Sequence, residues 1–346
     1  MMRSTSISTE KAIHRPSRGC RHGRRATSKR DYRFIVWVLS DANLAFVSRR
    51  GLCNWYKQAL RVKSSVWRST LGVVAALGWL PKCGWVSEEH LMAEMFANKV
   101  ALVTGASSGI GRATALAFAK EGASVVIGNR RMEEGRATIR MIEEIGGHGA
   151  FIQTDVAEPT QVEALVNGAV QLYGRLDYAC NNASLAPAAG TLTHLVSLND
   201  WNQTVAVNLT GMWLSMKAEI PHMLKQGAGS IVNMSSVAGV VGSRAGGAAY
   251  TATKHGIVGL SRLAALEYAQ SGIRVNALCP GVIDTPIWDP LFGQNDQMKA
   301  LVISREPIGR MGSVEEVAAA VVWLCSDASS FVTGTAMMVD GGLTAQ

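Results

Sequence analysis

The chain has 346 residues, 48% of them hydrophobic, and a formal net charge of +8. This composition readily supplies one sizeable hydrophobic core. Six cysteines occur without a Cys-x2-Cys spacing, and the seven histidines show no metal-ligand spacing. The pattern therefore argues against a zinc site, a redox pair or a disulfide framework, and we expect no metal and a reducing, cytoplasmic setting.

The charge is unevenly distributed along the chain. Residues 1–91 contain 17 Lys and Arg against 5 Asp and Glu, a net charge of +12, whereas residues 92–346 contain 17 basic and 21 acidic residues. Five of the nine tryptophans also precede residue 92. The basic charge of the whole chain therefore belongs to an N-terminal extension, and we expect no nucleic-acid partner for the segment that follows.

Three interpretations of the extension, residues 1–91, stay open. Residues 1–30 are rich in Arg and Ser and poor in acidic residues, as in organelle-targeting presequences. The extension could instead be a basic arm that meets nucleic acid or a membrane, or upstream sequence read from a start codon placed too early. Its apolar runs, residues 34–39 and 71–80, are too short to span a bilayer. We favour the misplaced start, no membrane partner, and a single folded domain over residues 92–346.

A glycine-rich turn separates a predicted strand from a predicted helix. Residues 98–103 form a short apolar run that predicts a buried strand, and Gly105, Gly109 and Gly111 precede an apolar-periodic helix. Glycines let the backbone turn tightly and approach a pyrophosphate, while the helix N-terminus offers unpaired N–H groups to its charge. The Gly-x3-Gly-x-Gly spacing therefore predicts a dinucleotide site, with a purely structural turn as the alternative.

The second predicted strand, residues 124–127, ends at Gly128-Asn129-Arg130-Arg131. A carboxylate just past this strand would accept a hydrogen bond from a ribose 2′-OH and repel a 2′-phosphate. Here an uncharged asparagine precedes two arginines, which would pair with a 2′-phosphate. The pattern favours NADP(H). NAD(H) is the alternative if the two arginines are only a solvated pair at the start of a helix.

Strands and helices alternate along the domain, which predicts an α/β fold of the Rossmann type. We expect a doubly wound, mostly parallel seven-stranded sheet with helices on both faces, because residues 101–103 and 125–127 are apolar on both sides. Ser313 and Glu316 form a capping box before a helix that runs through Leu324. The expected strands are residues 99–103, 124–127, 149–153, 178–181, 230–234, 274–279 and 336–339.

Tyr250 and Lys254 lie four residues apart, downstream of Ser236. On a helix this spacing puts both side chains on one face, whereas His255 points roughly 100° away, which indicates a packing or interface role. A tyrosine hydroxyl titrates near pH ~10, and a nearby ammonium group lowers that pKa. The pattern predicts a proton-transfer site, in which Ser236 holds a substrate oxygen and Lys254 lowers the pKa of Tyr250.

With these motifs in order, residues 95–346 strongly resemble the short-chain dehydrogenase/reductase family. The resemblance rests on Thr104–Gly111, which matches the Thr-Gly-x3-Gly-x-Gly turn, and on Asn181-Asn182-Ala183, which matches the Asn-Asn-Ala-Gly motif. Ser236 and the Tyr250–Lys254 pair complete the match. The resemblance implies an oxidoreductase that transfers hydride between a nicotinamide and a carbonyl or secondary alcohol, with Tyr250 as general acid and base.

The same resemblance implies four catalytic residues, Asn208, Ser236, Tyr250 and Lys254, with Asn208 linking the lysine to solvent through water. A catalytically silent dinucleotide-binding regulator is the rival function. Such relatives typically lose the tyrosine or the lysine, and this chain keeps both.

Motif and resemblance together also define a cofactor-binding set. By resemblance, Asp155 contacts the adenine ring, and Thr285 lies near the nicotinamide carboxamide. The full set is Gly105, Ser107, Ser108, Gly109, Ile110, Gly111, Asn129, Arg130, Arg131, Asp155, Val156, Asn182, Ala183, Tyr250, Lys254, Pro280, Gly281, Ile283 and Thr285.

The chain departs from the family pattern in two places. Ser184 replaces a glycine, which puts a side chain beside the expected nicotinamide ribose. Residues 239–247 are one residue longer than is common and hold four glycines, which favours a mobile loop at the substrate mouth. Ser235 adjoins Ser236, and strand alternation lets only one of them face the site; we favour Ser236.

The substrate is expected to lie between residues 184–195, 237–246 and 283–305. The last segment offers six apolar side chains, which could line a pocket for a ketone or alcohol or could serve packing instead: Ile283, Ile287, Trp288, Leu291, Phe292 and Leu301. Residues 331–342 resemble the family's last strand, which commonly packs across a two-fold axis. We therefore expect a homotetramer, with a homodimer as the alternative.

Overall fold

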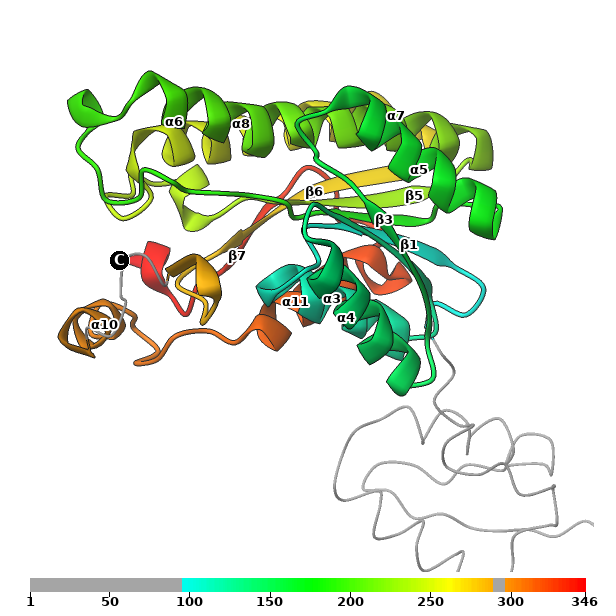
Figure 1. The fold of residues 1–346 in the computed structure, drawn as a ribbon, viewed down its shortest axis with the longest axis horizontal. Helices are drawn as coiled ribbons and strands as arrows, with labels where there is room; N and C mark the ends of the chain where they lie inside the picture. Colours follow the sequence, from blue (N-terminus) through cyan, green and yellow to red (C-terminus); the bar gives the residue numbers. More distant parts are fainter. Residues whose placement is uncertain (1–94, 289–295) are drawn as a thin grey trace, which may run out of the picture. The chain divides into compact units, whose positions relative to one another are not determined.

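Seven strands form one sheet in the computed structural model, which describes residues 95–288 and 296–346 (Figure 1). The strand order is β3-β2-β1-β4-β5-β6-β7, and every neighbouring pair is parallel, so the sheet is parallel throughout. The strands are β1 (Val100–Thr104), β2 (Ser124–Asn129), β3 (His148–Gln153), β4 (Tyr178–Asn181), β5 (Gly229–Met234), β6 (Ile273–Pro280) and β7 (Ala336–Val339).

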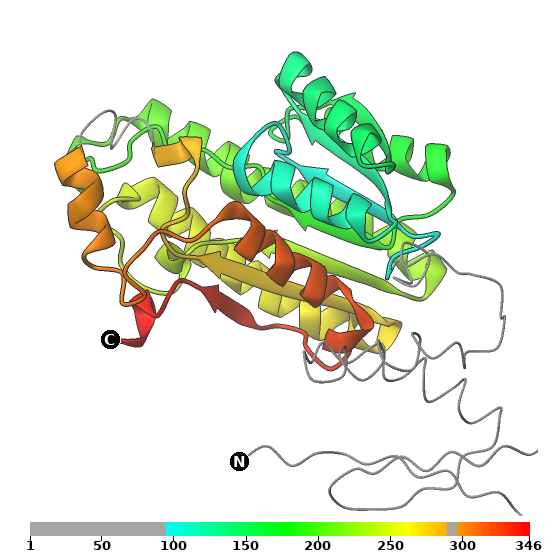
Figure 2. The same cartoon turned by 90° about the horizontal axis from the view of Figure 1, so that it is seen from below.

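Helices cover both faces of this sheet (Figures 1 and 2). One face carries α3 (Gly109–Lys120), α4 (Met132–Glu144) and α11 (Val314–Cys325), and the other carries α5 (Pro159–Tyr173), α7 (Gly211–Gln226) and α8 (Gly247–Tyr268). Successive residues of β1 alternate between two buried cores, with Val103 in one and Leu102 in the other. The predicted two-sided apolar strands are therefore confirmed, because a parallel sheet is buried on both faces.

Shorter elements complete the described chain. Helix α6 (Leu198–Thr204) continues through a π-helical turn, η3 (Val205–Thr210), into α7. The other short elements are η2 (Thr193–Leu195), η4 (Val237–Gly239), η5 (Ala269–Ser271), η6 (Pro286–Trp288), α10 (Asp296–Ile303), η7 (Asp327–Ser329) and η8 (Leu343–Ala345).

The predicted local signals agree with these elements. All seven expected strands are present with ends shifted by two residues or fewer. The capping box is confirmed, because the Ser313 hydroxyl accepts from Glu316 N and the Glu316 carboxylate accepts from Ser313 N. Cys180, Cys279 and Cys325 are buried, as expected for small hydrophobic residues. The N-terminal extension, residues 1–91, lies outside the described residues, and so do Leu291 and Phe292.

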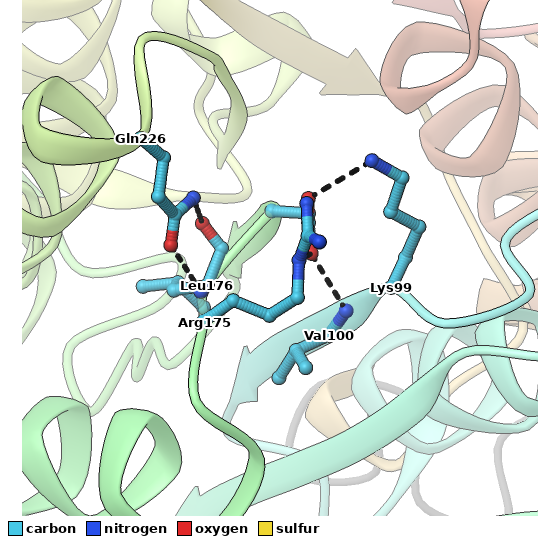
Figure 3. Close-up of polar contacts among 6 residues, drawn as sticks. Lys99, Val100, Arg175, Leu176 and Gln226 are labelled. Atoms are coloured by element: carbon cyan, nitrogen blue, oxygen red, sulfur yellow. Dashed lines mark hydrogen bonds and ion pairs between the residues drawn. The ribbon is translucent and has the colours of Figure 1, made fainter.

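A carboxylate joins the amino ends of two neighbouring strands (Figure 3). Asp177, just before β4, accepts from Val100 N at 3.0 Å, from Arg175 Nε at 2.7 Å and from Lys99 Nζ at 3.3 Å. Gln226, the last residue of α7, exchanges two 2.8 Å bonds with the backbone of Leu176. These contacts hold the amino ends of the central strands β1 and β4 against the end of α7.

Candidate active site

A cleft of about 510 Å³ opens at the carboxyl ends of the strands, where the strand order reverses between β1 and β4. Ligands of open α/β sheets bind at such a reversal. Of the predicted catalytic and cofactor-binding residues, all line this cleft except Gly111 and Asn208. The lining residues that received no role in the sequence analysis are Gly128, Thr154, Leu185, Val207, Met234 and Pro286. Most of them lie at or next to the ends of strands. Their place in the cleft depends on how the strands are arranged in the sheet, which the local sequence does not reveal.

The glycine turn that follows β1 is tightly packed. Gly105 has a φ of +70°, and a Cβ there would lie 2.7 Å from Cα of Ala183. A Cβ on Gly111 would collide with the carbonyl oxygen of Gly105. Gly111 is therefore required for packing of α3 against the turn, which explains why it lies behind the cleft rather than in it.

The first turn of α3 faces the cleft without a side-chain cap. Ser108 is the N-cap residue, yet its hydroxyl makes no hydrogen bond to the helix amides. Instead, Nη2 of Arg131 donates to Ser107 Oγ at 2.7 Å and to Ser108 Oγ at 3.0 Å. The amides at the helix start therefore remain available for an anion such as a pyrophosphate. The tight turn and the uncapped helix fit a dinucleotide.

Two arginines gather at one end of the cleft. Asn129 is buried at the end of β2 and donates to Arg131 O at 2.6 Å, which fixes the start of the following segment. Arg130 Nη1 lies 3.7 Å from the carboxylate of Asp155, while Arg131 reaches back across the glycine turn. Arg131 Nη1 also lies 3.5 Å from the exposed carboxylate of Glu134, so this end of the cleft holds two guanidinium groups, each beside one carboxylate, next to the two serine hydroxyls.

The three residues of the predicted proton-transfer site meet at the other end. Tyr250 and Lys254 lie on α8, and Ser236 follows β5, so all three line the cleft. Lys254 Nζ donates to Met234 O at 2.8 Å and lies 5.2 Å from the centroid of the Tyr250 ring. Ser235 is buried and donates to Lys254 O at 2.9 Å. The hydroxyl of Ser235 is thus occupied, which leaves Ser236 as the serine beside Tyr250.

Burial dominates the electrostatics of this site. Burial raises the pKa of Tyr250, and a hydrogen bond with Ser236 opposes the shift. Burial also lowers the pKa of Lys254 to about 7. The lowering of the Tyr250 pKa by Lys254 stays a prediction; in the protein without ligand burial is the largest cause acting on each pKa, and the ammonium lies over the tyrosine ring, bonded to a backbone carbonyl.

Asn208 lies in the π-helical turn between α6 and α7 and is fully buried. Its amide exchanges two 2.9 Å bonds with the backbone of Leu185, and its Nδ2 lies 3.5 Å from Thr253 Oγ1, next to Lys254 in sequence. Asn208 therefore clamps the segment after β4 to the catalytic helix. π-helical turns are frequent at functional sites.

The two departures from the family pattern have different outcomes. Ser184 lines the cleft, and its φ is not positive, so a side chain is tolerated there without backbone strain. Residues 237–246, expected at the substrate mouth, do not line the cleft. That segment instead contacts the loop after β4, where Gly190 N donates to Ala245 O at 2.9 Å. From the expected apolar segment, Ile283 and Ile287 line the cleft, whereas Leu301 is half-exposed on α10.

Two features are absent from the described residues. Within residues 95–288 and 296–346, no group of three or more His, Cys, Asp or Glu side chains has an arrangement suited to a metal ion. In the same part of the chain, no helix combines the length and hydropathy needed to cross a bilayer.

Similarity to known proteins agrees with this geometry. Residues 105–344 match the family model described as enoyl-(acyl carrier protein) reductase. Cyclohexanol dehydrogenase of Acinetobacter sp. (strain SE19) is 42% identical over 258 residues, covering 75% of this chain and all of that protein. Cis-4-hydroxycyclohexanecarboxylate dehydrogenase of Sinomonas cyclohexanicum is 43% identical over 255 residues, covering 73% of this chain and all of that protein.

A solved structure supports the same relationship. A variant of actinorhodin polyketide ketoreductase, determined with NADPH, superimposes with a TM-score of 0.68 at 36% identity and covers 72% of this chain and 98% of its own. The chain belongs to the short-chain dehydrogenase/reductase family, whose members are nicotinamide-dependent oxidoreductases acting on alcohol and carbonyl groups.

Proposed function

We propose that Tyr250 is the general acid and base of this oxidoreductase, assisted by Ser236, Lys254 and Asn208. When bound, the nicotinamide supplies or accepts the hydride and, in its oxidised form, adds a positive charge. Ser236 donates a hydrogen bond to the substrate oxygen, and Tyr250 passes a proton to that oxygen in reduction or removes it in oxidation. The convergence of the Ser236 and Tyr250 side chains in one cleft supports these roles.

The raised pKa of Tyr250 adds a requirement to this mechanism. Burial disfavours the phenolate in the free protein, so alcohol oxidation needs additional positive charge near the hydroxyl. A protonated Lys254 and the oxidised nicotinamide ring are the two sources that this site would bring together. In the reductive direction a neutral tyrosine is already the correct protonation state.

We infer that the protein prefers NADP(H) over NAD(H). Two arginines follow β2 where a carboxylate would repel a 2′-phosphate, and Arg131 is held in the cleft by two hydroxyls. The solved relative with NADPH is consistent with this preference.

We also propose that the substrate is a cyclic secondary alcohol or the corresponding ketone. The two relatives described above are named for hydroxyl groups on six-membered carbon rings. The apolar side chains that line the cleft include Leu185, Ile283 and Ile287. Among the lining residues described, the charged side chains are Arg130, Arg131 and Asp155 at the opposite end and Lys254 at the catalytic end. An uncharged ring is therefore favoured over a charged substrate.

Exposed apolar side chains bear on how the subunits of this protein assemble. We propose a homotetramer, because apolar side chains of α7, α8 and the segment before β7 are exposed: Trp213, Leu263, Leu266 and Phe331. We propose a cytoplasmic location and a folded domain over residues 92–346, with residues 1–91 dispensable for the reaction.

The mechanism is tested by Tyr250→Phe, which removes the transferred proton and little else. Turnover of cyclohexanol with NADP+, and of cyclohexanone with NADPH, is expected to fall by about 10²–10⁴-fold. NADPH affinity, measured by fluorescence titration, should stay within about threefold of the wild type, because the cofactor contacts persist. Linear ketones and 3-oxoacyl thioesters serve as competing substrate classes. Unchanged turnover in the variant would sink the assignment, and a preference for thioesters would overturn the substrate class alone.

A further inference from the structure

Glu219 lies within α7 and is fully buried, where an ionised carboxylate is costly. It belongs to a polar network with Asn181 at the end of β4, Asn233 on β5 and Ser261 on α8. Among the described residues, Glu219 forms no ion pair with Lys, Arg or His. Its hydrogen-bond partner, Asn181, is neutral.

The network lacks one hydrogen-bond donor. Asn181 Nδ2 donates to Glu219 Oε2 at 3.0 Å and to Asn233 Oδ1 at 3.1 Å. Asn233 Nδ2 donates to Ser261 Oγ at 2.9 Å and to a methionine sulfur of α7 at 3.1 Å, and the Ser261 hydroxyl donates to a backbone carbonyl of its own helix. Every donor is therefore used, while Glu219 Oε1 and Asn181 Oδ1 are buried acceptors without a partner.

Neither an amide flip nor a water molecule in the cavity beside Asn181 supplies this donor. Rotating the Asn181 amide exchanges its oxygen and nitrogen but adds no donor. The small cavity beside Asn181, lined by Thr104, Val207 and Met212, is too tight to admit a water molecule. Within the network, the group that can gain a proton and become a donor is the Glu219 carboxyl.

We propose that Glu219 is a positioning residue of the cofactor cleft, a neutral carboxylic acid whose proton is donated to Asn181 Oδ1. One proton at Oε1 turns two unpaired acceptors into a hydrogen bond and removes the buried charge. Burial raises the pKa of Glu219 to about 7, opposed by the Asn181 hydrogen bond, which agrees with a protonated carboxyl below neutral pH.

The residues that follow Asn181 at the end of β4 link the Glu219 network to the cleft. Asn182 Nδ2 donates to Thr104 O at 3.1 Å and to Gly105 O at 3.2 Å, and the Asn182 and Ala183 amides donate to Thr104 Oγ1. These bonds hold the start of the glycine turn. The inference thus rests on the assignment of this cleft to the cofactor: ionisation of Glu219 would leave Asn181 Oδ1 without a donor and weaken the support of the turn.

The other titratable groups near Glu219 set the control for a pH experiment. Burial raises the pKa of the Cys180 thiol on β4 well above its ordinary value, and the charge of Glu219 adds to this shift. The thiol therefore stays neutral. His222 of α7 contacts Asn167 of α5 at the exposed surface. On α8, Ser261 belongs to the network, whereas Lys254 donates to a carbonyl of β5. Burial lowers the pKa of Lys254 to about 7, close to that of Glu219, so both groups change charge near neutral pH. Any pH effect has to be measured as a difference between the wild type and a Glu219 variant.

The protonation state is tested directly by infrared difference spectroscopy of wild type against Glu219→Gln. At about pH 6 the wild type should show the C=O stretch of one additional protonated carboxyl, which disappears as the pH rises to about 8.5. The glutamine variant should lack the band at both values. A carboxylate band for Glu219 at about pH 6 would overturn the proposal, whether or not the protein binds NADPH.

The positioning role is tested by NADPH affinity of the same full-length proteins, measured by fluorescence titration without turnover. Between about pH 6 and 8.5, the wild-type Kd should rise about fivefold more than that of Glu219→Gln, whose neutral amide replaces the acid. Glu219→Leu, which pairs with neither atom of Asn181, should bind more weakly than the glutamine variant at both values. A ratio of wild-type to glutamine-variant Kd that is constant with pH would refute positioning. Absence of NADPH binding by the wild type would instead refute the cofactor assignment, and the infrared result would stand on its own.

Discussion

At the scale of single residues, burial rather than charge pairing controls the candidate catalytic groups. Tyr250 and Lys254 lie one turn apart on α8, yet the lysine bonds to Met234 O and both groups are removed from water. Desolvation favours the neutral form of each. A neutral tyrosine suits the proposed donation of a proton to a carbonyl oxygen, and positive charge near the hydroxyl would favour the phenolate.

Lys254 predicts a particular pH dependence of stability. Its pKa is lowered by burial from 10.5 to about 7, so between these values the folded protein binds fewer protons than the unfolded chain, and the free energy of unfolding rises with pH. The rise is bounded by roughly 5 kcal/mol, at 1.36 kcal/mol per pKa unit. Urea unfolding from about pH 7 to 10 should show the rise in wild type and lose most of it in Lys254→Met. The matched control is Lys120→Met, at the exposed end of α3; equal slopes in all three proteins would contradict the prediction.

Arg131 predicts cofactor selectivity at the same scale. Arg131→Ala should lower kcat/KM for NADPH by about 10–100-fold, since a charge-assisted bond to phosphate is worth about 1.5–3 kcal/mol. The value for NADH should change less than about threefold, because that cofactor has no 2′-phosphate. Arg136→Ala, an exposed arginine of α4 paired with Glu133, is the control. A parallel loss with both cofactors would assign Arg131 to structure instead of selectivity.

At the scale of elements, the candidate site depends on backbone contacts at both ends of β1 and β4. At the carboxyl ends, Asn182 ties β4 to the glycine turn, and Asn208 ties the next residues to α8. At the amino ends, Asp177 and Gln226 join the same strands to α7 (Figure 3). The two strands that bound the cleft are thus held at both ends, which keeps the site preorganised.

Asp177→Ala should destabilise the protein without changing its chemistry. The carboxylate is nearly buried and accepts from Val100 N, Arg175 and Lys99. Its loss leaves a buried amide unpaired, so the free energy of unfolding should fall by about 2–4 kcal/mol. Glu133→Ala, which breaks an exposed ion pair, should cost less than about 0.5 kcal/mol. Urea unfolding measures both. Activity at low temperature should be retained, and a cost for Asp177→Ala as small as the control would count against the prediction.

At the scale of the whole molecule, the exposed apolar side chains of α7, α8 and the segment before β7 are unusual for a monomer. Leu266 is 82% exposed, and Phe331 is fully exposed. Exposed apolar side chains are candidates for contacts between subunits. It supports the proposed assembly through these side chains, none of which lines the cleft.

Leu266→Glu should reduce the molecular mass in solution, because a carboxylate in an apolar contact between subunits would be desolvated without a partner. Light scattering after size exclusion should show a tetramer for wild type and a smaller species for the variant. Leu172→Glu, at an exposed position of α5, is the control. A monomeric wild type would overturn the assembly, and an unchanged tetramer in the variant would exclude α8 from the contact.

Features that the sequence alone specifies are those governed by neighbours along the chain. The alternating apolar pattern of residues 101–103 and 125–127, the glycine turn and the capping box at Ser313 predict their elements correctly. Each depends on backbone geometry or hydrogen bonds within a few residues. The order of the motifs likewise identifies the family, which similarity to known proteins confirms.

Features that only the tertiary structure decides depend on residues that are distant in sequence. The pKa direction of Tyr250, the clamp of Asn208 on Leu185 and the absence of residues 237–246 from the cleft follow from packing between elements. Glu219 carries no sequence signal, because a glutamate on an amphipathic helix is ordinarily solvated. Its burial against Asn181 arises only when α7 packs on the sheet. Desolvation is a property of the assembled core, so the ionisation of buried groups cannot be derived from local sequence.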